Sequence, residues 1–91
     1  MKNKLNNARE TINEIDKEMI ELFKKRMKAV EDVVAYKIEN NLPVLDSKRE
    51  DSLIEKNLNI LNDKSLEKYY LTFIKGVLES SKDYQKDIIK K

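Results

Sequence analysis

The longest feature of this 91-residue sequence is a helical pattern of apolar residues that runs from about residue 4 to residue 39 without a glycine or a proline. Its apolar positions alternate steps of three and four, as in a coiled-coil seam. This seam comprises Leu5, Ala8, Ile12, Ile15, Met19, Leu22, Arg26, Ala29 and Val33. One helix over this range would be roughly 50 to 55 Å long. Because a compact chain of this length is only about 30 Å across, the helix must overhang its own domain.

A second, shorter helix is predicted after Pro43. Proline lacks the amide hydrogen and disfavours the helical conformation in the residue before it, so the first helix ends before this point. Ser47 and Glu50 form a capping box, a serine followed three residues later by a glutamate. The second helix is therefore expected to begin at Ser47 and to run to Leu61.

A third helix is expected after a turn at residues 62–63, with Ser65 or its neighbour as its first residue. Its stripe comprises Leu66, Tyr70, Phe73, Ile74, Val77, Ser81, Gln85 and Ile88. The predicted fold class is all-α, with a long first, a short second and a medium third helix. Because the overhanging seam stays apolar, a second copy of the chain is its simplest cover, and we predict an intertwined helical homodimer.

The composition excludes several kinds of chemistry. The chain has no cysteine and no histidine, which excludes disulfides, thiolate nucleophiles, imidazole bases and the common zinc and iron sites. No metal or cofactor is predicted. Residues 1–4 lead into the amphipathic pattern without a continuous apolar segment, so we expect no signal peptide, no membrane span and a cytoplasmic location. The interspersed charges, net +2, argue against nucleic acid as a partner.

Four polar residues stand where packing alone calls for apolar ones. Arginine is rare in this lysine-rich chain, and its planar fork suits carboxylates and phosphates. Arg26 nevertheless lies within the apolar seam, and Lys37 projects from nearly the same face three turns later. Ser81 and Gln85 interrupt the stripe of the third helix. Buried cations are costly unless something pairs with them.

Two interpretations of these four residues are open. Taken singly, Arg26 pairs with a carboxylate of another helix, such as Glu50, while Lys37 reaches water and Gln85 bonds to the backbone. Taken together, they indicate a pocket for a small anion. Arg9 lies ~25 Å from Arg26 along the helix, so it can join such a pocket only from a second chain.

The start of the second helix is a further candidate anion site. Arg49 lies in its first turn, and Asp46 directly precedes it. Helix amides and the helix dipole favour an anion there. The capping box explains Glu50 without a ligand, so the sequence leaves the direction of this side chain open.

In their order, these residues resemble the all-helical AroQ class of chorismate mutase. The resemblance covers Leu5 to Ile88. It is carried by Ala8-Arg9-Glu10-Thr11-Ile12-Asn13-Glu14-Ile15-Asp16, by Arg26 and Lys37, by Pro43-Val44-Leu45-Asp46-Ser47-Lys48-Arg49-Glu50, and by the late Ser81 and Gln85. It implies one domain, residues 1–91, and a dimer with two equivalent sites.

The implied activity is the rearrangement of chorismate to prephenate, in phenylalanine and tyrosine biosynthesis. This reaction needs no nucleophile, metal or proton carrier, which suits a chain without histidine or cysteine. The resemblance implies that Arg26, together with Arg9 of the other chain, binds the two substrate carboxylates. The substrate would then be held in its folded, reactive shape.

The resemblance also implies individual roles. Substrate binding would fall to Arg9, Arg26, Val33, Lys37, Asp46, Arg49, Glu50, Ser81 and Gln85, and catalysis to Lys37, Gln85, Arg26 and Glu50. Lys37 and Gln85 would bind the ether oxygen. Glu50 and the backbone near Asp46 would hold the ring hydroxyl. Val33 would pack on the ring.

Two other functions stay open. An isochorismate-pyruvate lyase resembles this family in fold, although Glu50 favours the mutase. A non-catalytic helical interaction module is also compatible with the predicted helices. Such a module would not require polar residues on core faces. Docking onto a larger pathway enzyme is a further possible partnership.

Overall fold

A computed structural model describes residues 3–90 and places three α-helices in them. The helices are α1 (Lys4–Glu39), α2 (Ser47–Leu61) and α3 (Lys64–Lys90). The predicted all-α class and the lengths of the three helices are confirmed. None of the described helices has the length and apolar character that crossing a membrane requires. The predicted domain, residues 1–91, also includes Met1, Lys2 and Lys91, which lie outside the described residues.

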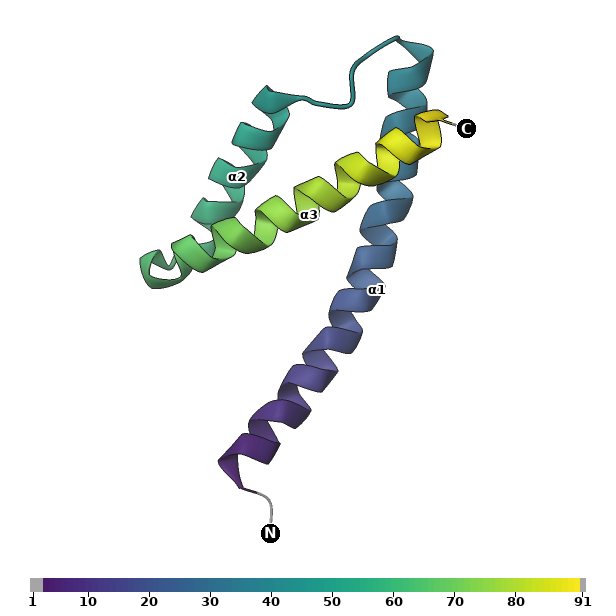
Figure 1. Cartoon of the computed structure of the whole chain (residues 1–91). Helices are drawn as coiled ribbons and strands as arrows, with labels where there is room; N and C mark the ends of the chain where they lie inside the picture. The colour runs from purple at the N-terminus through teal and green to yellow at the C-terminus, as the bar shows by residue number, and fades with distance from the viewer. Residues whose placement is uncertain (1–2, 91) are drawn as a thin grey trace.

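The central helix of the arrangement is α3, which packs against both α1 and α2. In Figure 1, α2 and α3 form a hairpin, and the C-terminal part of α3 crosses the C-terminal part of α1. The N-terminal half of α1 continues well past this crossing. The first turn of α1 and the last turn of α3 therefore lie far apart, with the last turn of α3 beside the upper part of α1.

Three of the helix ends follow local sequence signals. The side chain of Asn3 accepts a hydrogen bond from the amide of Asn6 at 2.8 Å and caps α1. After α1, Asn41 has a positive φ of 54°, and Asn62 caps the end of α2 with a φ of 46°. Asparagine tolerates this left-handed conformation better than most residues. The predicted stop before Pro43 and the predicted turn at residues 62–63 are thus confirmed.

The start of α2 differs from the predicted capping box. Asp46, not Ser47, is the N-cap, because its Oδ1 accepts a hydrogen bond from the amide of Arg49 at 3.0 Å. Aspartate caps as well as serine does, and its negative charge is favourable at the positive end of the helix dipole. The side chain of Glu50 is consequently not part of a capping box, and it pairs with Lys82 of α3.

The apolar core is small and lies where α3 crosses α1. Within residues 3–90, the buried apolar side chains are those of Val30, Val34 and Ile74. Val30 and Val34 lie one turn apart on a face of α1 next to the seam. The seam residue Val33 stays 46% exposed. Within one chain, α1 therefore buries a face next to the seam, because α3 packs on that face.

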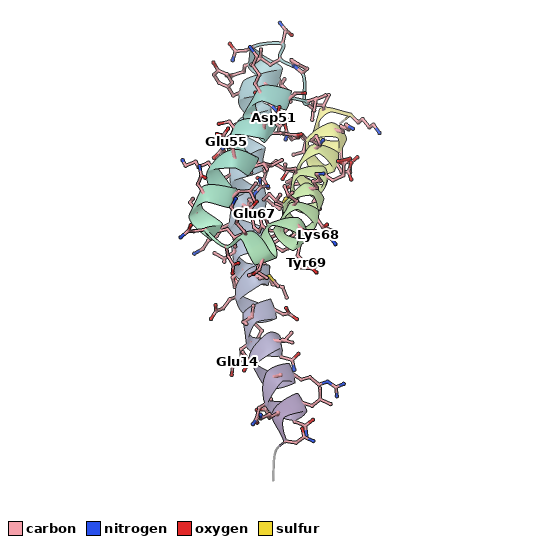
Figure 2. The ribbon with its side chains drawn as sticks, turned by 90° about the vertical axis from the view of Figure 1, so that its left-hand side faces the viewer. Glu14, Asp51, Glu55, Glu67, Lys68 and Tyr69 are labelled. Carbon is pink, nitrogen blue, oxygen red and sulfur yellow. The ribbon has the colours of Figure 1, made fainter. Side chains whose placement is uncertain are left out.

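The overhang predicted for the first helix is confirmed. The radius of gyration is 16.7 Å and the chain measures 58 × 30 × 15 Å, whereas a compact chain of this length has a radius of gyration of ~12 Å. Figure 2 shows the lower half of α1, around Glu14, extending beyond α2 and α3. The large apolar residues exposed along this half are Leu5, Ile12, Ile15, Met19, Ile20, Leu22 and Phe23.

Candidate active site

A cavity of about 150 Å³ lies between the C-terminal half of α1, the first turns of α2 and the C-terminal half of α3. It brings together eight of the nine residues that the resemblance singled out: Arg26, Val33, Lys37, Asp46, Arg49, Glu50, Ser81 and Gln85. They come from all three helices and from the segment that precedes α2. The cavity thus depends on the packing of α3 between the other two helices.

Two cations of α1 reach across the cavity to two polar residues of α3. Arg26 Nη1 donates a hydrogen bond to Ser81 Oγ. Lys37 Nζ donates to Gln85 Oε1 at 3.0 Å and to the carbonyl oxygen of Val44 at 2.7 Å. Ser81 and Gln85 are each only 6% exposed. The polar interruptions of the two apolar stripes therefore face one another.

These contacts overturn the interpretation that takes each polar residue singly. Among the described residues, Arg26 pairs with a hydroxyl and not with a carboxylate. Lys37 points inwards, and Gln85 accepts its hydrogen bond from a side chain. Because Lys37 can only donate, the oxygen of Gln85 must face it, and the amide NH₂ of Gln85 remains as a donor on the cavity side.

The Glu50 carboxylate is held on the α3 side of the cavity by Lys82. Glu50 Oε2 lies 3.3 Å from Lys82 Nζ, and the two side chains are 23% and 21% exposed. The hydrogen bond with Glu50 raises the pKa of Lys82 above its ordinary value of 10.5, so Lys82 is protonated at neutral pH. The side-chain direction that the sequence left open is thus towards α3.

The cavity carries a surplus of positive charge. Its cations are Arg26, Lys37, Arg49 and Lys82, and its carboxylates are Asp46 and Glu50. Asp46 is already engaged as the N-cap of α2, and Glu50 is paired with Lys82. An excess of two positive charges remains, which suits a small ligand with two negative charges.

Arg9 is the one predicted site residue that this chain does not bring to the cavity. It lies on the exposed N-terminal half of α1, seventeen residues before Arg26, which corresponds to ~25 Å along the helix. Within residues 3–90, no group of carboxylates is arranged to ligate a metal ion. The cavity of one chain therefore offers cations, an amide, a hydroxyl and a paired carboxylate.

Residues 8–86 match the model of the family described as chorismate mutase type II. The chain belongs to the chorismate mutase type II family. Its resemblance to the all-helical AroQ class, read from the arginine, lysine and proline-containing motifs, is thereby confirmed. The matched segment contains every lining residue of the cavity and also Arg9.

Curated relatives of this chorismate mutase family member include three bifunctional chorismate mutase/prephenate dehydratases of Buchnera aphidicola. The protein of subspecies Schizaphis graminum is 37% identical over 91 residues, which are 99% of this chain and 24% of the relative. Those of Baizongia pistaciae and Acyrthosiphon pisum are 40% and 32% identical, and the match covers 25% and 22% of their lengths. The chain thus spans about a quarter of the length of these relatives. No solved structure matches it significantly.

Sequence reasoning missed five residues that line the cavity of this family member. They are Val30, Val44, Leu53, Leu78 and Lys82. Four are apolar and are not distinguished from ordinary core residues. Lys82 directly follows Ser81 and precedes Gln85 by three residues, so it lies beside the polar stripe of α3. That position was the available signal, but a lysine flanking a stripe is also typical of a solvated helix surface.

Proposed function

We propose that this chain is a chorismate mutase that converts chorismate to prephenate in the biosynthesis of phenylalanine and tyrosine. The observation that carries the proposal is the pairing of Lys37 with Gln85 across a cavity with excess positive charge. Membership of the chorismate mutase type II family supports it. The proposed active form is a homodimer in which each chain is a single domain, residues 1–91.

The first contribution of the site is to restrict the substrate. In the rearrangement, the carbon–oxygen ether bond breaks while a carbon–carbon bond forms within the same molecule, so nothing is added or lost. Arg26 would bind one substrate carboxylate, because its guanidinium has donors beyond the one that bonds Ser81. Arg9 of the second chain would bind the other. Holding both carboxylates keeps the flexible arm folded over the ring and removes part of the entropic barrier.

The second contribution is electrostatic. Negative charge gathers on the ether oxygen as its bond to carbon breaks. The third hydrogen of the Lys37 ammonium and the amide NH₂ of Gln85 would donate to this oxygen. Both donors are already held in place, because Lys37 bonds Val44 and Gln85 at the same time. Donors that need no rearrangement stabilise the transition state more than the ground state.

The remaining residues would fix the ring. Glu50 would accept a hydrogen bond from the ring hydroxyl, helped by the backbone near Asp46. Val33 would pack on the ring, and Arg49 and Ser81 would complete the polar lining. These roles are assigned by the resemblance, and the positions of the side chains around one cavity support them.

A homodimer would complete each site and cover the exposed part of α1. An apolar groove of about 430 Å³ lies between α1 and α3, lined by Met19, Leu22, Phe23, Tyr70 and Phe73 among others. The overhanging half of a second α1 has the apolar surface to fill such a groove. The same half carries Arg9, which would then reach the partner's cavity.

The relatives are bifunctional chorismate mutase/prephenate dehydratases, and a larger enzyme that consumes prephenate is therefore a proposed partner. The cytoplasmic location stays a prediction.

The test is to add purified protein to chorismate and, in a parallel assay, to isochorismate. The loss of chorismate's ultraviolet absorbance is followed, and prephenate and pyruvate are quantified separately. The proposal predicts one prephenate for each chorismate and no pyruvate. The Lys37→Ala variant, purified in the same way, controls for contaminating host enzyme. Pyruvate release, especially from isochorismate, would contradict the mutase and favour the lyase.

Absence of turnover with both substrates, in a folded protein, would leave the non-catalytic module. A quadruple alanine variant would distinguish the two functions, with replacements at Arg26, Lys37, Ser81 and Gln85. It would stabilise a non-catalytic module, whereas it would abolish the activity of an enzyme.

A further inference from the structure

Lys82 lines the cavity, but neither the residue pattern nor the family resemblance gives it a role. Its ammonium lies between two carboxylates, 3.3 Å from Glu50 Oε2 and 3.4 Å from Glu79 Oε2. The two partners differ in their surroundings, because the side chain of Glu79 is 63% exposed and that of Glu50 only 23%. Lys82 thus connects the solvent side of α3 with the cavity.

We propose that Lys82 is a positioning residue that holds the Glu50 carboxylate at the cavity wall, where it accepts a hydrogen bond from the ring hydroxyl of the substrate. This inference rests on the proposed function. It adds a residue to the site and makes the contact between α2 and α3 part of substrate recognition.

Glu50 depends on Lys82 for a counter-ion. A carboxylate that is mostly withdrawn from water is costly unless a cation or hydrogen-bond donors face it. The hydrogen bonds of Arg26 and Lys37 go to Ser81, Gln85 and Val44 instead. Among the described residues, Lys82 is the cation that forms an ion pair with Glu50.

The ion pair with Lys82 also fixes the direction of the Glu50 side chain. Glu50 lies in the first turns of α2 and Lys82 on α3, so the pair joins two helices across the cavity wall. Without it, the flexible glutamate side chain would gain rotamer freedom and turn to water. A hydrogen-bond acceptor for the ring hydroxyl would then be present only part of the time.

Lys82 is poorly suited to bind a substrate carboxylate directly. Its single positive charge already faces two negative charges, those of Glu50 and Glu79. An additional anion would be repelled by both. Lys82 therefore acts through Glu50, and its contribution is to orientation and specificity.

The test is a double-mutant cycle on the complete dimer, with Lys82→Met, Glu50→Gln and the double variant. We expect Lys82→Met to lower kcat/KM for chorismate about 10-fold, the size of coupling that is usual for residues in direct contact. In the Glu50→Gln background, the same change should alter kcat/KM by no more than about 2-fold. Lys82→Arg should restore most of the loss, because it keeps the charge.

The matched control is Lys86→Met, one turn further along α3. Lys86 is exposed and does not line the cavity, so its kinetic constants should equal those of the wild type. A chorismate analogue that lacks the ring hydroxyl gives a second readout. Lys82→Met should leave kcat/KM for this analogue unchanged, whereas a merely structural loss would lower it together with that for chorismate. Lys82→Gln replaces Lys82→Met if the latter fails to fold.

An equal loss in both Glu50 backgrounds would overturn the inference, as would a Lys82→Met enzyme with wild-type kcat/KM. These outcomes differ from failure of the proposed function, which would appear as absence of turnover in the wild type itself.

Discussion

At the scale of single residues, two cations of the site, Arg26 and Lys37, have neutral hydrogen-bond partners among the described residues. Arg26 bonds a hydroxyl, and Lys37 bonds an amide and a carbonyl oxygen. Such hydrogen bonds orient a cation without neutralising it. The positive charge stays available for an anionic ligand, which distinguishes this arrangement from a structural ion pair.

Lys37→Ala should affect catalysis far more than folding. Removal of a preorganised donor to the ether oxygen is expected to lower kcat about 100- to 1,000-fold, while loss of two hydrogen bonds lowers the free energy of unfolding by about 1 to 2 kcal/mol. Chorismate turnover and urea unfolding measure the two effects. Lys28→Ala, an exposed lysine on α1, is the matched control. A Lys37→Ala enzyme with near wild-type kcat would refute the mechanism.

Alkaline pH should weaken the fold through two groups. Hydrogen bonds to Glu50 and to Glu31 raise the pKa of Lys82 above 10.5 and that of Tyr84 above 10.0. The native state therefore keeps these protons to higher pH than the unfolded state. Their stabilisation is fully present below about pH 10 and is lost as the pH rises through the raised pKa values.

Urea unfolding at about pH 8 and about pH 11 measures this loss. Tyr84 Oη donates to Glu31 Oε2 at 2.7 Å, so Tyr84→Phe should reduce the difference between the two pH values. An unchanged difference would show that the Tyr84–Glu31 bond does not contribute.

At the scale of helices, the sequence predicted the bounds of the elements well, because their signals are local. Pro43 and the two asparagines with positive φ end helices by their own backbone preferences. The N-cap of α2 was misassigned by one residue because Asp46 and Ser47 are both good caps and adjacent. Only the hydrogen bond from the amide of Arg49 distinguishes them.

The two candidate caps of α2 make a matched pair of variants. Asp46→Ala should lower the free energy of unfolding by about 1 kcal/mol, since it leaves the amide of Arg49 without its acceptor. Ser47→Ala should change it by less than about 0.5 kcal/mol, as at an ordinary surface position. Chemical denaturation of both variants checks this. A larger loss for Ser47→Ala would restore serine as the cap.

The composition of the site was predictable, whereas its pairing was not. Arg26, Lys37, Ser81 and Gln85 were recognisable because each interrupts an apolar stripe. Which of them meet depends on where α3 crosses α1, a long-range packing feature with no local signal. The same reason explains why Val30 and Val34, rather than the seam residues, are buried, and why Lys82 was missed.

At the scale of the whole molecule, one chain leaves a large apolar surface uncovered. Its buried apolar core is small, and the overhanging half of α1 exposes a row of large apolar residues. Small domains rarely gain enough stability from such a core alone. Sedimentation at micromolar concentration should therefore give twice the chain mass of 10.8 kDa. A species of 10.8 kDa would contradict the dimer.

A pair of charge variants on neighbouring residues locates the interface. Ile15→Lys should shift the sedimentation equilibrium towards the monomer, because it introduces a charge into the apolar seam. Glu14→Lys introduces a lysine at the neighbouring position, beside the seam on the overhanging half of α1 (Figure 2). This variant should leave the dimer intact. Equal behaviour of the two variants would show that the seam is not the contact surface.

The most direct test of a mutase site shared between two chains is to mix the Arg9→Ala and Arg26→Ala proteins and measure chorismate turnover after subunit exchange. Each variant alone should be nearly inactive. The mixture should recover about a quarter of wild-type activity, since half of the dimers are mixed and each of these has one site with both arginines intact. No recovery, with exchange verified by native mass spectrometry, would contradict the account.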